Sequence, residues 1–382
     1  TENTEGLGCS TINEHTQAKG HYCHQNRWVG LQQRRRSPAY QSTSENQAQT
    51  KRRCKIWREM CQLLGMNAAL PTNFSFSFTG FAKRGGCSDK HCDGWGIAFY
   101  EGRGLRTFLD PAPAAHSPIA TLVARYPVKT HNMMAHIRYA TIGNGGALEN
   151  VHPFTRELWG IHFCFSHNGD IPNFSKCNPP MLGKTCETGG DCLMYNPVGD
   201  TDSESVFCAI LNALKAEFCS LPTLPVLYEF LQKLCNEIVK ENDGTIFNFL
   251  LGCGEFTLFA FSWPGSRPGS DVWNALYYTL RKPPFTTASL IDCDYMMDFS
   301  KVNTPLDSVA IIATKPLTKD EDWIEMKKGE LLLFDKGRPY SAAHHIDEIE
   351  KQGRGLFTKV KSMQRIIVSE ISHDSKEIIA GQ

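Results

Sequence analysis

The sequence has no net charge, no long hydrophobic run and no signal peptide. Lys+Arg and Asp+Glu both number 40, so no overall field attracts nucleic acid or an anionic membrane. A transmembrane helix needs about 18 or more apolar residues, and Gly252, Gly254 and Glu255 divide the longest run, residues 247–263, into two predicted strands. The N-terminus has no apolar signal-peptide core. These absences predict a protein without nucleic-acid or membrane partners.

The fifteen cysteines do not form the pattern of a secreted disulfide scaffold. Their number is odd and the chain is long, whereas such scaffolds are short and hold paired cysteines. Cys164, Cys208, Cys235 and Cys253 lie inside apolar runs, which is typical of small buried thiols in a reducing compartment. We therefore predict a cytoplasmic protein, with organellar import as the alternative if residues 1–59 are a presequence.

Residues 1–59 contain few aliphatic side chains and no methionine, and they hold ten Lys/Arg against five Asp/Glu. Such a segment cannot bury enough apolar surface to offset its ordering entropy. We predict that it is disordered or non-native: a presequence, a propeptide or an extension from an incorrect gene model. Its lack of amphipathic periodicity favours the gene-model extension over a presequence. We interpret His21, Cys23 and His24 as a chance cluster and not as a metal site.

From Cys61 onward the sequence alternates between apolar runs and turn-forming residues. Runs rich in β-branched and aromatic residues predict strands. These runs cover residues 61–68, 94–100, 133–141, 161–169, 256–263, 274–280, 308–314 and 330–335. The run 161–169 ends in Asn168-Gly169, a pair that often forms a hairpin turn.

Two segments carry clear helix start signals. Residues 117–127 predict a short helix with Ser117 as its N-cap, followed by proline in the first turn. Residues 201–214 predict a second helix that opens with a capping box of Thr201 and Glu204. Its apolar residues follow the helical period.

A third predicted helix covers residues 224–239. Six apolar residues lie on one face of it: Val226, Leu227, Phe230, Leu231, Leu234 and Ile238. The order of strands, then helices, then strands fits an α+β layered domain better than alternating βαβ units. Residues 341–382 are charged and form a C-terminal tail to which the sequence assigns no role.

Seven short motifs follow one another within residues 60–204. They read MCQLLGMNA, FTGFAKRGG, DGWGIAFYEG, AHIRYATIG, ALENVHPFTRELWG, FSHNGDIPNF and GDTDSE. In this order they resemble the class-II glutamine amidotransferase family, the N-terminal-cysteine branch of the Ntn hydrolases, over residues 61–340. The match is to the stand-alone type, which includes bacterial glutamine amidotransferase-like proteins and a fungal glutathione-degrading amidotransferase subunit. The resemblance implies a four-layer αββα sandwich.

The resemblance implies that Cys61 is the nucleophile. Its thiol would attack the amide carbon of glutamine or of a γ-glutamyl peptide and form a γ-glutamyl thioester. The base in this family is the α-amino group of the same cysteine, whose pKa of about 8 leaves a useful neutral fraction near pH 7. An amide nitrogen has no such basicity, so the mechanism requires that the bond between Met60 and Cys61 is absent. Met60 is the first methionine of the sequence, and its removal after initiation would expose Cys61.

The resemblance also assigns an oxyanion hole and a binding site for the amino-acid head. Asn168 and Gly169 match the residues that donate hydrogen bonds to the developing oxyanion. Arg138 matches the residue that holds the substrate α-carboxylate, for which a planar guanidinium is suited. Asp202 matches the residue that takes the α-ammonium group.

Three further residues match recurrent family positions: His136, Thr141 and His152. We interpret them as pocket supports, with Thr141 and His152 in contact with substrate. The glycines of the DGWG motif, Gly94 and Gly96, are expected to allow close backbone approach, and Trp95 is expected in the core.

The resemblance implies no cofactor and no metal. Cys87 and Cys92 have a C-x₄-C spacing, but no second pair completes a zinc site. Ile142 stands where some synthase-fused relatives carry histidine, and residues 175–198 form an insertion before Asp202.

The expected partners are a γ-glutamyl small molecule and either an ammonia-accepting or a peptidase subunit. The alternative is a non-catalytic binding or regulatory subunit that retains the fold with a blocked Cys61.

Overall fold

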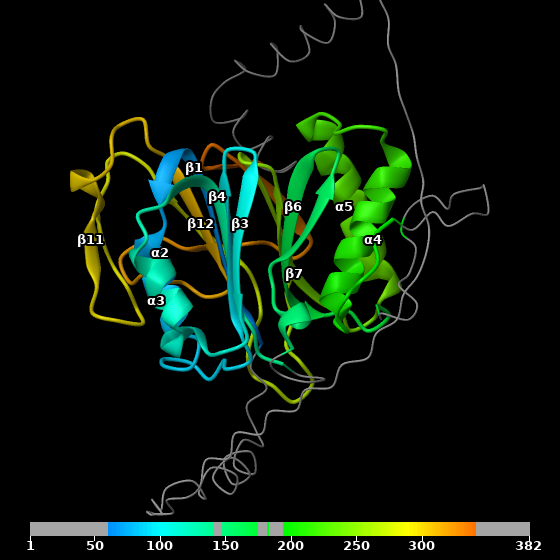
Figure 1. Ribbon diagram of the computed structural model, residues 1–382, viewed down its shortest axis with the longest axis horizontal. Helices are drawn as coiled ribbons and strands as arrows, with labels where there is room; N and C mark the ends of the chain where they lie inside the picture. The colour runs from blue at the N-terminus through cyan, green and yellow to red at the C-terminus, as the bar shows by residue number, and fades with distance from the viewer. Residues whose placement is uncertain (1–59, 141–146, 175–181, 183–193, 341–382) are drawn as a thin grey trace, which may run out of the picture. The chain divides into compact units, whose positions relative to one another are not determined.

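Two antiparallel β-sheets face each other in the region that follows Cys61 (Figure 1). The computed structural model describes residues 60–140, 147–174, 182 and 194–340, and every statement on structure below refers to these residues.

The first sheet of the described chain has seven strands in the order β13-β9-β12-β1-β4-β2-β3. Its strands are β1 (Gln62–Asn73), β2 (Trp95–Glu101), β3 (Gly104–Asp110), β4 (Lys129–Ile137), β9 (Tyr277–Arg281), β12 (Val309–Ala313) and β13 (Ile324–Glu325). The N-terminal strand β1 lies in the interior of this sheet, because it pairs with β12 on one side and with β4 on the other.

The second sheet has six described strands in the order β15-β14-β8-β7-β6-β5. Its strands are β5 (Phe154–Leu158), β6 (Ile161–Asp170), β7 (Ile246–Cys253), β8 (Thr257–Trp263), β14 (Glu330–Asp335) and β15 (Arg338–Tyr340). A separate hairpin joins β10 (Thr287–Ser289) to β11 (Met296–Asp298). The two predicted strands on either side of Gly254 are thus confirmed as β7 and β8.

Helices cover the outer face of each sheet. The helices α2 (Ser75–Lys83) and α3 (Pro118–Arg125) pack on the first sheet through an apolar cluster that includes Phe78, Phe81 and Val123. The helices α4 (Asp202–Glu217) and α5 (Leu224–Glu241) pack on the second sheet, with Leu231 among their buried residues. Short 3₁₀ turns cover Ala114–His116, Leu148–Asn150 and Phe299–Lys301.

A third apolar cluster fills the space between the sheets. It includes Leu63 of β1, Met134 of β4, Cys164 of β6, Leu250 of β7 and Leu332 of β14. The arrangement is therefore helices, sheet, sheet, helices, and the predicted α+β class and four-layer αββα sandwich are confirmed. The residues of all three clusters lie between Leu63 and Phe334, so this part of the chain forms its own hydrophobic core.

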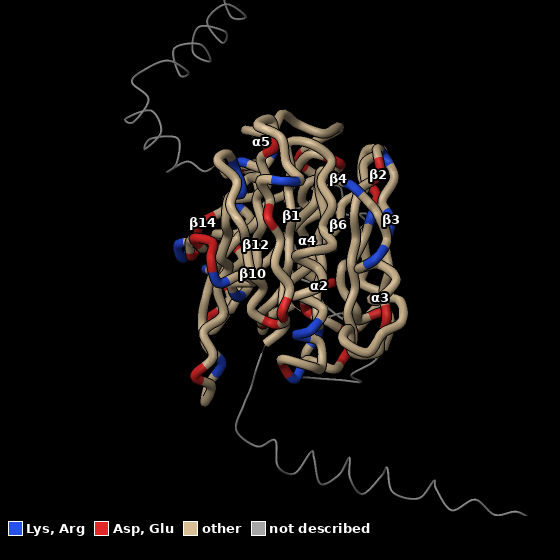
Figure 2. Tube along the Cα trace, turned by 90° about the vertical axis from the view of Figure 1, so that its left-hand side faces the viewer, with Lys and Arg blue, Asp and Glu red and all other residues tan. Residues whose placement is uncertain are grey.

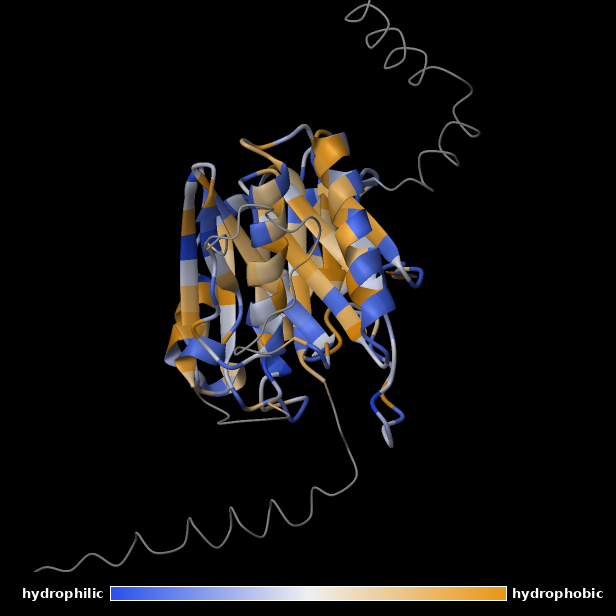
Figure 3. Ribbon diagram, turned by 90° about the vertical axis from the view of Figure 1, so that its right-hand side faces the viewer, coloured by the Kyte–Doolittle hydropathy of each residue, from blue (hydrophilic) through white to orange (hydrophobic). Residues whose placement is uncertain are grey.

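The helices of the outer layers are amphipathic, and charges of both signs lie on the surface. The face of α4 and α5 in Figure 3 shows hydrophilic and hydrophobic residues alternating along the helices, as an amphipathic helix on a sheet requires. On the face seen in Figure 2, both signs of charge are interspersed over loops and strand ends. No helix of the described chain has the length and apolar character needed to span a bilayer.

Most predicted elements are confirmed, with small shifts of their ends. Ser117 caps α3 by accepting a hydrogen bond from the Ala120 N–H, as its sequence position predicts. The four cysteines predicted inside apolar runs are buried and unpaired. Helix α2 was not predicted, because its alternation of phenylalanine with small polar residues gives no clear helical period.

The Asn168-Gly169 pair, although a frequent turn signal, does not form a hairpin turn, because both residues lie inside β6 and pair with residues of β7. The prediction that Val226 lies on the apolar face of α5 is wrong: Val226, the third residue of the helix, is 44% exposed and lies outside the stripe that faces the sheet.

The DGWG motif allows two close backbone approaches. Gly94 adopts a positive φ of 109°, a conformation that side chains with a Cβ rarely adopt. A Cβ on Gly96 would lie 2.3 Å from the carbonyl oxygen of His152. Trp95 between them is fully buried. The expected roles of these three residues are therefore confirmed.

Gly96→Ala should destabilise the protein by about 1–3 kcal/mol, because the added methyl group forces β2 away from the chain at His152. The matched control is Gly104→Ala on the neighbouring strand β3, where the nearest atom to a new Cβ is 3.4 Å away. Urea unfolding should show a lower midpoint for Gly96→Ala alone, at a similar m-value. Equal midpoints for the two variants would contradict this packing argument.

Candidate active site

Strand alternation directs several polar side chains to one end of the space between the sheets. Successive side chains of a strand point to opposite faces, so residues two apart share a face. Leu63 faces the opposite sheet, and Cys61 precedes it by two residues. By the same count, Arg138 follows Met134 on the inner face of the first sheet. On the second sheet, Asn168 and Asp170 of β6 lie on the same face as Cys164, which points toward the first sheet.

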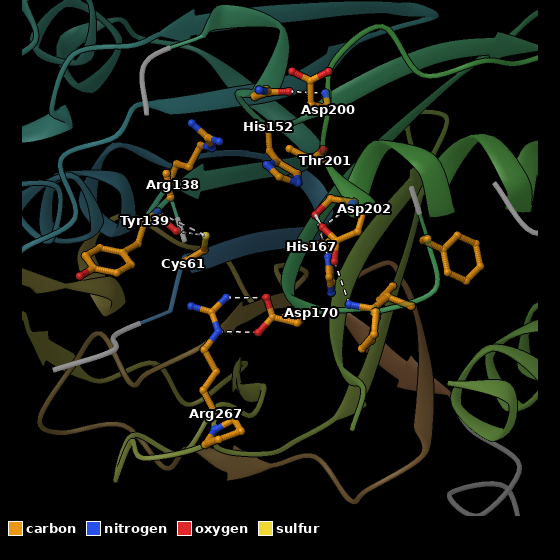
Figure 4. Close-up of a pocket in the computed structure, with 18 residues that line it drawn as sticks. Cys61, Arg138, Tyr139, His152, His167, Asp170, Asp200, Thr201, Asp202 and Arg267 are labelled. Atoms are coloured by element: carbon orange, nitrogen blue, oxygen red, sulfur yellow. Dashed lines mark hydrogen bonds and ion pairs between the residues drawn. The ribbon is translucent and has the colours of Figure 1, made fainter. Parts of the chain in front are cut away.

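These side chains surround a cavity of roughly 800 Å³, a size typical of small-molecule sites. Eighteen described residues line it, among them Cys61, Arg138, His152, Gly169 and Asp202. Figure 4 shows the Cys61 thiol between Arg138 on one side and the pair of Asp170 and Arg267 on the other. The structure therefore brings together five of the eight residues to which the resemblance assigns a role in the site. Asn168 and His136 are not among the lining residues, and Thr141 lies outside the described residues.

The Cys61 side chain is half-buried and contacts the backbone of Tyr139. Its Sγ accepts a hydrogen bond from the Tyr139 N–H at 3.3 Å. Burial raises the pKa of the thiol, and the Tyr139 N–H, Arg267 and Arg138 only partly oppose this. The thiol is thus protonated near neutral pH. Among the described residues, no imidazole or carboxylate forms a hydrogen bond with this sulfur.

Arg138 follows the last residue of β4 and is 5% exposed. Its Nη1 is buried and has no hydrogen-bond partner among the described residues. A buried guanidinium nitrogen without a partner carries a desolvation cost, which an anionic ligand in the cavity would remove. The position therefore suits a carboxylate of a bound small molecule.

Asp202 is the first residue of α4, and its carboxylate lines the cavity. Oδ2 accepts a hydrogen bond from the Ile171 N–H and Oδ1 accepts one from the Ser203 N–H, both at 2.8 Å. Because a carboxylate has about four acceptor positions, these two bonds orient it and leave capacity for a cation.

The capping box predicted for α4 is half formed. Thr201 caps the helix by accepting a hydrogen bond from the Glu204 N–H at 3.2 Å. Glu204 does not return the bond to Thr201. Its carboxylate accepts hydrogen bonds from the Gly199 N–H at 2.7 Å and from Arg156 at 2.6 Å, so it holds the segment before the helix and not the cap itself.

The Asn168 amide group is buried, and both its oxygen and its nitrogen lack hydrogen-bond partners among the described residues. Gly169 beside it lines the cavity. A Cβ at Gly169 would overlap the Ile246 carbonyl oxygen at 1.7 Å, so only glycine permits this approach of β6 to β7. The Asn168 N–H₂ group is thus a buried donor without a partner among the described residues, and Asn168 itself is not one of the residues that line the cavity.

The rings of His136 and His152 lie against each other, with centroids 4.1 Å apart and planes tilted by 31°. Burial is the main reason that the pKa of each ring lies well below its ordinary value, with the Arg138 charge adding to it at His136. Both rings are therefore neutral. His152 lines the cavity, and neither of its nitrogens has a hydrogen-bond partner among the described residues.

The sequence did not predict the ion pair of Asp170 and Arg267. The guanidinium donates two parallel hydrogen bonds to the carboxylate, at 2.5 Å from Nε and 2.7 Å from Nη2. Asp170 directly follows the Asn-Gly pair in its motif and could have been noticed there. Arg267 lies in a proline- and glycine-rich loop between β8 and β9, and this composition predicts a turn without indicating a site.

His167 was also missed, because a histidine inside an apolar strand is usually structural. Its Nδ1 accepts a hydrogen bond from the Ser203 hydroxyl at 2.8 Å, and its Nε2 donates one to the Ile246 carbonyl at 3.3 Å. Burial lowers the pKa of the ring, although Asp202 opposes this. The neutral ring ties the start of α4 to β6 and β7, and so positions Asp202 relative to Gly169.

Some predictions lie outside the described residues. These are the predictions for Thr141, Ile142, residues 1–59, the tail 341–382 and most of the insertion 175–198. Cys87 and Cys92 are described and exposed. Within the described ranges, no three metal-ligating side chains gather into a group that could hold a metal ion.

Comparisons with known proteins agree with this geometry. The family model for "Glutamine amidotransferases class-II" matches residues 60–354. The Escherichia coli protein named "Putative glutamine amidotransferase YafJ" is 42% identical over 279 residues, which cover 73% of this chain and 98% of that protein. A Haemophilus influenzae protein named "Putative glutamine amidotransferase" is 40% identical over 285 residues, which cover 75% of this chain and 87% of that protein.

The solved structures include a similar chain. The 2.0 Å crystal structure of a predicted glutamine amidotransferase from Pseudomonas aeruginosa has a TM-score of 0.51 and 34% sequence identity. The match covers 75% of this chain and 97% of that one. The family match spans the thiol, both walls of the cavity and all four layers. This chain therefore belongs to the class-II glutamine amidotransferase family.

Proposed function

We propose that the protein is a thiol-dependent amidohydrolase that cleaves the γ-amide of glutamine or of a γ-glutamyl peptide. The observation that carries this proposal is that one cavity is lined by the Cys61 thiol, by the buried Arg138 guanidinium, whose Nη1 has no partner among the described residues, and by the oriented carboxylate of Asp202. A zwitterionic amino-acid head offers the two charges that these groups would bind.

In the proposed complex, Arg138 binds the α-carboxylate and Asp202 binds the α-ammonium group. The side chain of the substrate then extends toward Cys61. The Asn168 amide and the Gly169 backbone N–H would donate hydrogen bonds to the oxygen that becomes negative, and one such donor lowers a barrier by about 3 kcal/mol. This assignment gives the unpaired Asn168 donor a partner that exists only during the reaction.

The proposed reaction has two steps. The free α-amino group of Cys61 takes the thiol proton, Sγ bonds to the amide carbon, and the carbon–nitrogen bond breaks as that proton passes to the departing amine. A water molecule then adds to the thioester carbon, the carbon–sulfur bond breaks, and glutamate leaves with the thiol restored. Ammonia departs if the substrate is glutamine, and a peptide departs if it is a γ-glutamyl peptide such as glutathione.

A partner subunit would accept the departing group in the cell. An ammonia-using enzyme fits glutamine as the substrate, and a peptidase fits a γ-glutamyl peptide. Steady-state turnover of glutamine and of glutathione by the same preparation distinguishes the two. The expected result is a higher kcat/KM for one of them, and no turnover of either would contradict the proposed function.

The second candidate function is a non-catalytic binding subunit. It would apply to protein in which Met60 stays bonded to Cys61, because the nitrogen of Cys61 is then an amide and cannot act as a base. Protein whose first residue is Cys61 should therefore be active, and protein that retains Met60 should lose at least about a hundredfold in kcat, in line with the contribution of a general base. Intact mass identifies each form before turnover is measured. Equal turnover would exclude the α-amino group as the base.

Cys61→Ala should abolish turnover, a loss of more than about a thousandfold, because no other group can form the thioester. Cys87→Ala is the matched control, since Cys87 is exposed and does not line the cavity. The measurement is release of glutamate by protein that begins at residue 61. Retained activity in Cys61→Ala would refute the nucleophile assignment.

Arg138→Lys should raise KM by about 10- to 100-fold with a smaller effect on kcat. The substitution keeps the charge but removes a bidentate, charge-assisted contact worth about 1.5–3 kcal/mol. Arg106→Lys serves as the control, because Arg106 pairs with Glu101 at the surface. A wild-type KM for Arg138→Lys would show that Arg138 does not hold the carboxylate.

A further inference from the structure

His91 lies next to the peptide bond that precedes the nucleophile. It is fully buried, and its Nε2 is 2.6 Å from the carbonyl oxygen of Met60. The C=O and C–N bonds of a peptide are about 1.23 and 1.33 Å long, so this oxygen lies about 2.3 Å from the Cys61 nitrogen. Nε2 is therefore within about 5 Å of that nitrogen, a gap that one water molecule spans.

The other ring nitrogen of His91 faces a carboxylate. Nδ1 is 3.4 Å from Oδ2 of Asp89, whose carboxylate also contacts Nζ of Lys315 at 3.2 Å. The Tyr139 ring packs edge-on against the imidazole. Burial lowers the pKa of His91, while Asp89 and the Met60 carbonyl oppose this. The ring is thus neutral near pH 7 and carries a single N–H.

A single N–H cannot serve both neighbours. With Met60 in place, the N–H must be on Nε2, since a carbonyl oxygen only accepts hydrogen bonds. Nδ1 then presents its lone pair to the Asp89 carboxylate. A free amino group in place of the carbonyl removes this conflict, because Nδ1–H can point to Asp89 while Nε2 accepts a hydrogen bond. The Asp89–His91 arrangement suits an amine better than a peptide carbonyl.

We propose that Asp89 and His91 position the free α-amino group of Cys61, a role that rests on the function proposed above. Nε2 accepts a hydrogen bond from this group, directly or through one water molecule in the space of the Met60 carbonyl. The bond orients the amine so that its lone pair faces Sγ. His91 gives up no proton in the reaction; the proton of the thiol passes to the amine and then to the departing group.

The charged groups around Cys61 determine whether the pKa of its α-amino group is raised or lowered. Arg138 and Arg267 face Cys61 and favour a neutral amine, whereas Asp170 favours the ammonium form. On the side of His91, Asp89 also favours the ammonium form, Lys315 opposes it, and the neutral ring of His136 carries no charge. An acceptor such as Nε2 stabilises the ammonium form more than the amine. Removal of His91 should therefore lower the pKa of the α-amino group.

The test uses protein that begins at Cys61, verified by intact mass, and measures N-terminal carbamylation by cyanate as a function of pH. Cyanate reacts with the neutral amine, so the midpoint of the rate profile reports its pKa without any substrate. His91→Ala and Asp89→Asn should each move the midpoint to lower pH, by roughly one unit for His91→Ala. His131→Gln is the control, because His131 contacts the Ala68 carbonyl away from the cavity.

Turnover provides the second measurement. His91→Ala should lower kcat by about tenfold with KM nearly unchanged, and the acidic limb of its pH profile should shift with the cyanate midpoint. His91→Gln should recover part of kcat, because an amide oxygen can accept the same hydrogen bond. A merely structural role would lower the melting temperature without moving the midpoint. Asp89→Asn, which preserves shape, keeps the test valid if His91→Ala does not fold.

The outcomes separate this inference from the proposed function. Unchanged cyanate midpoints in both His91→Ala and Asp89→Asn, in protein that turns over substrate, would overturn the positioning role alone. Shifted midpoints in protein that turns over neither glutamine nor glutathione would support the positioning role and overturn the proposed function.

Discussion

The packing of one β-sheet against the other determines where each polar side chain of the cavity points. Because strand side chains alternate between faces, the face of β1 that carries Leu63 into the space between the sheets also carries Cys61. The same rule on β6 turns Asn168 and Asp170 toward the first sheet. The apolar cluster between the sheets therefore supports the chemistry at its end, since a shift of register by one residue would remove these side chains from the cavity.

Several buried polar groups in or beside the cavity have no hydrogen-bond partner among the described residues. Arg138 Nη1, both polar atoms of the Asn168 side chain and both nitrogens of His152 are buried without partners among the described residues. Each such group costs about 1–3 kcal/mol when it is left unpaired. The surrounding helices and sheets supply the stability that keeps them in place. A ligand that satisfies these groups recovers this free energy, which is how preorganised sites gain affinity and rate.

Much of the fold and of the site could be predicted from the sequence. Regular apolar periods gave most strands and the helices α3, α4 and α5, and the ordered motifs placed Cys61, Arg138, Gly169 and Asp202 in one site. The prediction did not extend to contacts between distant segments. Arg267 reaches Asp170 across 97 positions of the chain, and nothing in its own loop indicates this. Glu204 carries a sequence signal for capping, but its tertiary partner Arg156 competes for the carboxylate.

The interior position of β1 gives the proposed nucleophile an unusual setting. Chain ends usually fray, because few contacts hold them. Here Gln62 pairs with Ile137 of β4, and Thr314, after β12, accepts a hydrogen bond from the Leu63 N–H at 3.2 Å and donates one to the Gln62 side chain at 2.8 Å. Amide hydrogens at the start of β1 should then exchange with solvent only when the whole sheet opens. A protein that begins at Cys61 would carry its reactive end in one of its slowest-exchanging segments.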